Sequence, residues 1–210
     1  MPPDVRVCFF GDSLTAGVGD DAALGWVGRV VAAARRAGAD LTGYNLGVRG
    51  ETGPEVEARW RREAEPRFRG GAVHGVVVSF GVNDTTVDEG QRRVAEFDTV
   101  AALGRIAERA EADGWPLLVV GPTLVDDPEQ NRRIVELSAA MRGWSADSGV
   151  PYVEVAAGLD DAEWLTDVAS GDGAHPSERG YDRLSSLIDP MFAAWLHELA
   201  ERSGAASARR

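Results

Sequence analysis

Short apolar segments alternate with longer segments of helical periodicity along this chain. The apolar segments are rich in valine and aromatic residues and have the length of strands; they cover residues 5–10, 41–46, 73–80, 117–120 and 152–155, of which 41–46 is the weakest. The helical segments repeat apolar residues at three- and four-residue spacings; they cover residues 26–38, 54–65, 94–114, 134–144 and 177–199. This alternation predicts an α/β protein.

The strand segments are almost continuously apolar, as residues 76–78 and 117–120 illustrate. Strands that are buried on both faces have this composition, which is typical of a parallel sheet covered by helices on both sides. We therefore expect a three-layer α/β/α sandwich with about five parallel strands. No internal repeat or linker-like segment indicates a second domain, so we predict a single domain over residues 1–202 and a disordered tail over 203–210.

Charge and composition exclude several classes of function. The chain has 34 acidic and 22 basic residues and a formal net charge of −12, which would repel a phosphate backbone, so we expect no nucleic-acid partner. All 22 basic residues are arginine, which excludes Walker-type phosphate loops and lysine-based catalysis. No two histidines or cysteines have the spacing of metal ligands, so we expect neither a metal nor another cofactor.

Cysteine content and the absence of long apolar stretches suggest where the protein resides. The single cysteine, Cys8, lies inside the first apolar segment and is expected to be a small buried hydrophobic residue, with no disulfide partner. The N-terminus lacks the basic and apolar regions of a leader, and no apolar stretch approaches about 18 residues. We expect a cytoplasmic protein without a membrane span, although a leader already removed would leave no trace. The oligomeric state stays open.

Polar residues cluster where the predicted strands end and before the last predicted helix. The segments are residues 11–13, 45–52, 81–84 and 172–176. In open α/β sheets, ligands bind outside the carboxyl ends of the strands. We therefore expect all four segments to converge at one edge of the sheet.

Each of these residues also has a structural interpretation when it is taken alone. Ser13 can cap a helix, Asn83 can occupy a turn, and Asp172 belongs to a common Asp-Gly turn dipeptide. The other histidines, His74 and His197, lie far from the predicted edge and are expected to be structural or surface residues.

Together, the four segments resemble the signature blocks of the SGNH hydrolases, also called GDSL esterases and lipases. Gly-Asp-Ser-Leu at 11–14 resembles the nucleophile block, Asn-Leu-Gly at 45–47 the second block, Gly-Val-Asn-Asp at 81–84 the third, and Asp-Gly-Ala-His-Pro at 172–176 the fourth. The blocks occur in the family's order over roughly residues 5–200. The resemblance implies a flavodoxin-like SGNH hydrolase fold and a serine hydrolase that acts on ester bonds.

The resemblance also implies a role for each site residue. Ser13 would attack the ester and form an acyl-enzyme, His175 would be the general base and then the general acid, and Asp172 would orient the imidazole. The oxyanion would be bound by the backbone N–H groups of Ser13 and Gly47 and by the side-chain amide of Asn83.

The substrate is less well specified by the sequence. Small and apolar residues in the loops after the strands favour a neutral, short acyl group; the expected pocket residues are Val18, Leu124, Trp164 and Leu165. For Trp164 and Leu165 the alternative is that they pack a loop onto the core. No lid-sized insertion is evident, which favours a small soluble ester.

Several alternatives stay open. Within the same fold they are an acyl thioesterase, a lysophospholipase, a carbohydrate acetylesterase or a non-catalytic binding protein. Residues 17–22 also fit the G-x-G-x-x-A pattern of dinucleotide-binding domains. That fit is poor, because the predicted strand ends near residue 10 and two aspartates stand where a phosphate would bind.

Overall fold

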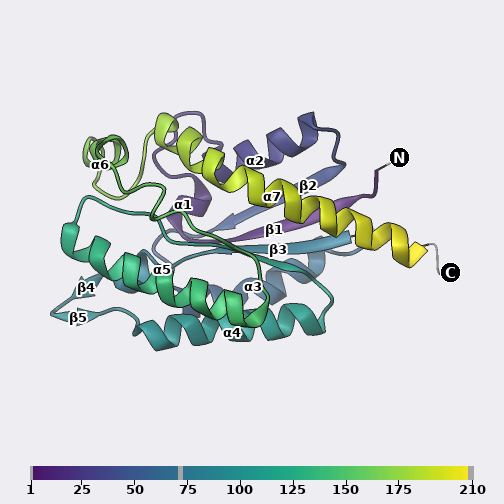
Figure 1. Cartoon of the computed structure of the whole chain (residues 1–210), viewed down its shortest axis with the longest axis horizontal. Coiled ribbons are helices and arrows are strands. Elements are labelled where there is room, and N and C mark those ends of the chain that lie inside the picture. The colour runs from purple at the N-terminus through teal and green to yellow at the C-terminus, as the bar shows by residue number, and fades with distance from the viewer. Residues whose placement is uncertain (1, 71–72, 208–210) are drawn as a thin grey trace.

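A single sheet of five parallel strands forms the centre of the molecule (Figure 1). The computed structural model describes residues 2–70 and 73–207, the last five in backbone only. The strands are β1 (Val5–Gly11), β2 (Leu41–Gly47), β3 (Val73–Ser79), β6 (Leu117–Val120) and β7 (Tyr152–Val153), and their order is β2-β1-β3-β6-β7. All neighbouring pairs are parallel. This is the flavodoxin-like strand order.

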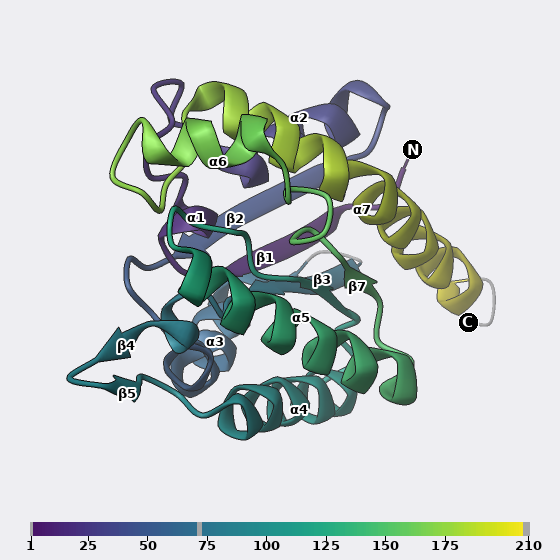
Figure 2. The same cartoon turned by 60° about the vertical axis from the view of Figure 1, so that its left-hand side comes forward.

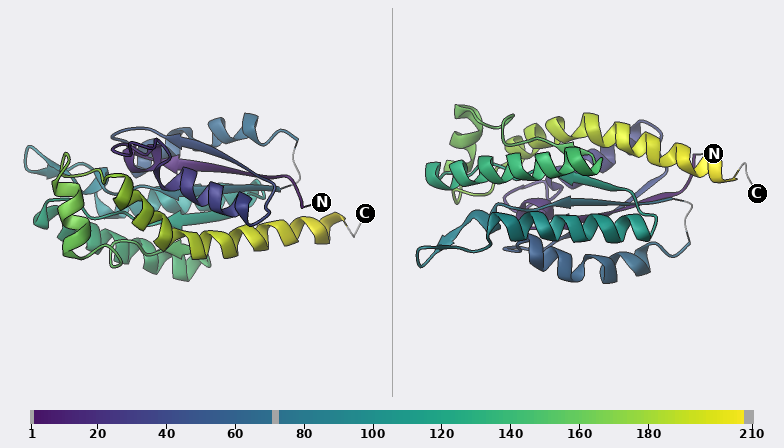
Figure 3. Two further views of the ribbon diagram at one scale, coloured as in Figure 1. Left: turned by 90° about the horizontal axis from the view of Figure 1, so that it is seen from above. Right: turned by 60° about the horizontal axis from the view of Figure 1, so that its bottom comes forward.

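Helices cover both faces of the sheet, which confirms the predicted three-layer α/β/α sandwich (Figures 1 and 3). One face is covered by α2 (Gly25–Arg36) and α7 (Glu178–Ser207), which pack on each other. The other face is covered by α3 (Gly53–Arg67), α4 (Glu96–Ala112) and α5 (Pro128–Ser148). All five predicted helical segments are therefore helices.

Alternate residues of β1 contribute to the two halves of the core. Phe9 lies in the half formed with α2 and α7, where its ring contacts Trp26 and Phe192 at centroid distances of 5.8 and 5.7 Å. Cys8 and Phe10 lie in the other half. Because successive side chains of a strand point to opposite faces, an uninterrupted apolar run fills both halves. Desolvation raises the pKa of the buried Cys8 thiol to about 12, so this residue is an unreactive core residue.

Some helix boundaries differ from the sequence expectation. Helix α5 begins at Pro128 because the Asp127 side chain accepts hydrogen bonds from the N–H groups of Glu129 and Gln130, at 2.9 and 3.0 Å. Helix α7 continues to Ser207, so the expected disordered tail is helical over 203–207, where alanines with high helix propensity follow Gly204. Residues 208–210 lie outside the described part of the chain.

Several short elements were not predicted. They are α1 (Ser13–Ala16), the 3-10 turn η1 (Asn83–Thr85), the β4 (Val87–Asp88) and β5 (Gln91–Arg92) hairpin, and α6 (Ala162–Ala169). The hairpin projects from the body of the protein (Figure 1), and its turn residues Glu89 and Gly90 both have positive φ, 48° and 80°. These elements are too short to produce a periodic hydrophobic signal. Over the described residues, the structure contains no helix of the length and apolarity required to cross a membrane.

The register of the strands places the ends of β1, β2 and β3 side by side, and with them the predicted site segments that follow. Gly11 at the end of β1 pairs with Gly47 of β2 and with Ser79 of β3. The chain segments that follow these three strands therefore leave the sheet side by side at its carboxyl edge. In Figure 2 the loop before α7 lies over the same edge, close to α1.

Candidate active site

Ser13 is held on a tight turn directly after β1. A Cβ at Gly11 would lie 2.1 Å from the carbonyl oxygen of Ser79 and 2.2 Å from Thr15 Oγ1, so only glycine allows this approach. The Asp12 side chain then caps the short helix α1 by accepting from Leu14 N–H at 2.9 Å. Ser13 is the first residue of this helix, where no intrahelical carbonyl is available to its N–H. Its N–H can therefore serve an external acceptor.

His175 connects Ser13 and Asp172. Its Nε2 lies 2.7 Å from Ser13 Oγ, and its Nδ1 lies 2.7 Å from Asp172 Oδ2. Ser13 and His175 are 162 positions apart, so only the fold brings them together. A carboxylate on Nδ1 leaves the lone pair of Nε2 directed at the serine hydroxyl, which is the geometry of a serine nucleophile with its general base.

Asp172 is held in its ionised form by its hydrogen-bond partners. Its Oδ1 accepts hydrogen bonds from the N–H groups of His175 and Ala174, at 2.9 and 3.0 Å. Partial desolvation acts to raise the pKa of Asp172, but the His175 ring and these two N–H groups together lower it to about 2. The carboxylate is therefore charged over the whole neutral range and can stabilise an imidazolium.

The expected oxyanion donors lie around the same turn, and two of them already have partners within the protein. Gly47 packs against α1, because a Cβ there would lie 2.3 Å from Ala16 N, and its N–H donates to Asn45 Oδ1 at 3.1 Å. The Asn83 side-chain N–H₂ donates to the Glu51 carbonyl oxygen at 2.9 Å and to Asp12 Oδ2 at 3.2 Å. A substrate oxygen would have to replace one of these internal acceptors.

Asp84 organises the elements behind Asn83, a role that was not predicted. Its carboxyl group is fully buried and accepts from Gly53 N–H at 3.0 and 3.1 Å and from Thr99 Oγ1 at 2.8 Å. These bonds connect η1 to the first residues of α3 and to α4. Desolvation raises the pKa of Asp84. Its position beside Asn83 in the third signature block was the only sequence signal for this role.

The residues expected to line a substrate pocket have different environments. Leu124 and Trp164 are only 2% and 1% exposed and belong to the hydrophobic core, where the indole N–H of Trp164 donates to the Leu124 carbonyl oxygen at 2.9 Å. Leu165 is half-buried against the same core, and Val18 is half-buried with its carbonyl oxygen accepting from Tyr181 Oη at 2.8 Å. Trp164 and Leu165 lie on helix α6 and not on a loop, so this part of the prediction is corrected.

The two remaining histidines lie outside the site. His74 is half-buried and stacks on Phe68 at a ring distance of 4.7 Å, and the exposed His197 lies 3.3 Å from a carboxylate oxygen of Glu201. Within the described residues, no group of three or more histidine, cysteine, aspartate or glutamate side chains could hold a metal ion.

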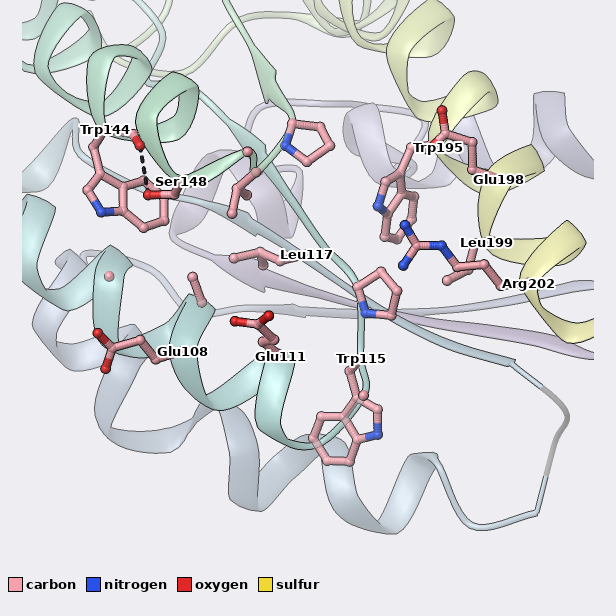
Figure 4. A pocket seen from close by; sticks show the side chains of 17 residues that line it. Glu108, Glu111, Trp115, Leu117, Trp144, Ser148, Trp195, Glu198, Leu199 and Arg202 are labelled. Carbon is pink, nitrogen blue, oxygen red and sulfur yellow. Dashed lines mark hydrogen bonds between the residues drawn. The ribbon is translucent and has the colours of Figure 1, made fainter. Parts of the chain in front are cut away.

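A separate cavity of about 480 Å³ lies at the amino end of the sheet (Figure 4). Trp115, Trp144 and Trp195 line it together with Leu117, the first residue of β6. None of its lining residues belongs to the four segments at the carboxyl edge. It is therefore separate from the Ser13 site.

Comparisons with known proteins agree with this fold. The sequence profile of the GDSL-like lipase/acylhydrolase family matches residues 9–183. Among solved structures, a lipase/acylhydrolase from Enterococcus faecalis is similar over 90% of this chain and 95% of that chain, with 23% identity and a TM-score of 0.74. The acetylxylan esterase Axe2 from Geobacillus stearothermophilus is similar over 89% and 93%, with 19% identity and a TM-score of 0.73. The protein TesA is similar over 89% and 97%, with 24% identity and a TM-score of 0.72. No curated protein sequence matches this chain.

Proposed function

The chain belongs to the GDSL-like lipase/acylhydrolase family and is an ester hydrolase, and we propose that Ser13, His175 and Asp172 are its catalytic triad. The observation that carries this assignment is the continuous pair of contacts from Ser13 Oγ through the His175 ring to Asp172, each 2.7 Å long. Contacts of this length allow a proton to move between serine and imidazole without rearrangement of the side chains.

The reaction proceeds in two halves. His175 Nε2 takes the Ser13 proton while Oγ attacks the carbonyl carbon of the ester, and the resulting imidazolium then protonates the departing alcohol. An acyl group is left on Ser13. In the second half, His175 removes a proton from water, the hydroxide attacks the acyl carbon, and Ser13 recovers its proton as the acid leaves. Asp172 keeps Nδ1 protonated throughout.

Negative charge on the carbonyl oxygen is stabilised by the N–H groups of Ser13 and Gly47 and by the Asn83 amide. In the free protein the Asn83 amide is held by Glu51 and Asp12, and the Gly47 N–H is held by Asn45. These internal bonds are exchanged for charge-assisted bonds to the oxyanion as negative charge develops. The exchange favours the transition state over the neutral ester.

The substrate is a small ester with a short acyl chain. Leu124 and Trp164 are packed into the core, so their side chains are not available to line a long acyl channel. Val18 and Leu165 are partly exposed and can contact a short acyl group. A thioester, a lysophospholipid or an acetylated carbohydrate remains an alternative substrate of the same machinery.

The deciding experiment is hydrolysis of p-nitrophenyl esters from acetate to laurate by the wild type and by Ser13→Ala. Ser186→Ala is the matched control, because Ser186 is an exposed serine on α7. We expect activity that is highest for short chains, is lost in Ser13→Ala and is kept in Ser186→Ala. Equal rates in wild type and Ser13→Ala would contradict the triad. Activity that is highest for laurate would contradict the short acyl group.

A further inference from the structure

The loop that carries both Asp172 and His175 is closed at its base by two hydrogen bonds. Asp167, on helix α6, accepts from the backbone N–H of Ser177 at 2.9 Å through Oδ2 and from Ser177 Oγ at 2.6 Å through Oδ1. We call this pair the Asp167–Ser177 clasp. It joins residues ten positions apart and encloses both members of the triad that follow α6.

The Ser177 side of the clasp is the beginning of α7. The Ser177 carbonyl oxygen accepts from Tyr181 N–H at 3.0 Å, so Ser177 occupies the capping position of this helix. Asp167 therefore places a negative charge at the positive end of the helix dipole. A Cβ at Gly180 would lie 2.3 Å from Asp167 Oδ2, so the glycine allows α7 to dock directly on the carboxylate.

The Asp167 side of the clasp is anchored in the core. Helix α6 is capped by Asp161, which accepts from the N–H groups of Glu163 and Trp164 at 3.0 and 3.1 Å. The buried Trp164 ring holds the helix against the Leu124 carbonyl oxygen. Asp167 thus connects a helix that is packed on the core to Ser177, only two positions after His175.

Other contacts also hold the loop, among them a hydrogen bond from the Gly173 N–H to the Val168 carbonyl oxygen at 3.0 Å. The Gly173 carbonyl oxygen accepts from Asp126 N–H at 2.7 Å, and Gly19 lies against His175 and Pro176, where a Cβ would be 3.2 and 2.7 Å from their atoms. The exposed side of the loop includes Asp172, whose side chain is 54% exposed. Directly after His175, Gly19 contributes packing against Pro176, whereas the clasp supplies side-chain hydrogen bonds to Ser177, two positions after His175.

We propose that Asp167 is a positioning residue that holds His175 at hydrogen-bond distance from Ser13. The inference rests on the proposed triad. Closing the loop at its base removes conformational freedom that the His175 segment would otherwise have before each turnover. A catalytic group must be held within about 0.5 Å of its productive position, and a misplacement of about 1 Å can cost roughly 10²-fold in rate. The clasp therefore acts on kcat and not on substrate affinity.

The test compares Asp167→Ala, Ser177→Ala and the exchanged pair Asp167→Ser with Ser177→Asp. Glu163→Gln is the control, because it removes different ion pairs between α6 and α7, those of Glu163 with Arg179 and Arg183. Steady-state kinetics with p-nitrophenyl acetate should show kcat reduced about 10- to 100-fold in Asp167→Ala, with KM changed less than about threefold. Ser177→Ala keeps the backbone bond and should lose about three- to tenfold. The exchanged pair should recover at least part of kcat, because aspartate is a good helix cap.

The outcomes separate the clasp from the triad and from general stability. Urea unfolding of each variant establishes that the folded protein is being assayed. If Asp167→Ala does not fold, the kcat of Ser177→Ala provides the test of the clasp. A kcat within twofold of wild type in the folded clasp variants, with Ser13→Ala inactive, would overturn the clasp and leave the triad standing. An active Ser13→Ala would overturn the triad itself. An equal loss of kcat in Glu163→Gln would also overturn the clasp, because any contact between α6 and α7 would then have the same effect on kcat.

Discussion

The side-chain amide of Asn83 donates a hydrogen bond to a carboxyl oxygen of Asp12 over 3.2 Å, although the two residues are 71 positions apart. Asp12 also caps α1 through Leu14 N–H, so the same carboxyl group holds both the turn of Ser13 and the Asn83 side chain. The Glu51 carbonyl oxygen accepts the second N–H of Asn83 at 2.9 Å. The position of Asn83 relative to Ser13 is therefore set before a substrate arrives.

Replacement of Asn83 by alanine should reduce kcat about 10²- to 10³-fold, because one donor to the oxyanion is lost. KM should change little, since the bond strengthens mainly in the transition state. Steady-state kinetics with p-nitrophenyl acetate measures both constants, and far-UV circular dichroism establishes that the fold is intact. A folded variant with near-wild-type kcat would remove Asn83 from the oxyanion hole.

Replacement of Asp172 by asparagine should reduce kcat on the order of 10³- to 10⁴-fold. The amide oxygen can still accept from the N–H groups of Ala174 and His175, so the loop keeps its backbone bonds. The amide nitrogen, however, faces Nδ1 as a donor and favours the tautomer that carries its proton on Nε2, toward Ser13. Asp160→Asn, at an exposed position, is the control. Comparable kcat values in both variants would contradict the role of Asp172.

Replacement of Asp12 by asparagine should change how stability depends on pH. Desolvation in the core raises the pKa of Asp12 from its usual 3.8 to about 7, against the hydrogen bond from Leu14, and the nearby Asp84 charge adds to the rise. Between about pH 4 and pH 7 the folded state therefore keeps a proton on Asp12 that the unfolded state has released. This group makes the free energy of unfolding fall as pH rises, by at most about 1.4 kcal/mol per pH unit.

Asp12→Asn lacks this proton. Its free energy of unfolding relative to wild type should therefore increase between pH 4.5 and pH 7, as measured by urea unfolding at both values. Parallel pH dependence in the two proteins would show that Asp12 is ionised in the folded state across this range.

Replacement of Gly47 by alanine should destabilise the protein by roughly 1–3 kcal/mol or more. The new Cβ would lie 2.3 Å from Ala16 N and 2.7 Å from Asp12 O, and these backbone atoms cannot move without displacing α1 and Ser13. Esterase activity should fall with stability. Gly143→Ala is the control, because a Cβ there meets no atom within 4 Å. In the interior of α5, alanine is more favourable than glycine by up to about 1 kcal/mol. Equal urea midpoints for both variants would contradict the tight packing at Gly47.

The main elements of the fold could be predicted from local patterns. The apolar runs at 73–80 and 117–120 are strands β3 and β6 to within a residue, because burial on both faces leaves a composition that is visible without any partner strand. Helix α6 could not be predicted in this way, since it is eight residues long and its only signals are the Asp161 cap and two buried side chains. The roles of Asp84 and Asp167 were missed for a related reason: their partners are 31 and ten positions away.

The sequence by itself determined the order and type of the major elements and the family resemblance of the four polar segments, because hydrophobic periodicity and short motifs are local properties of the chain. Only the tertiary structure decided which polar atoms meet. The contacts of Ser13 with His175 and of Asn83 with Asp12 depend on parallel strand register and on the docking of α6 and α7, which arise from packing between segments distant in the chain. The same packing buries Leu124, which lies in a loop, and Trp164, which lies on α6. Both side chains are enclosed in the core only when α6 has docked on it.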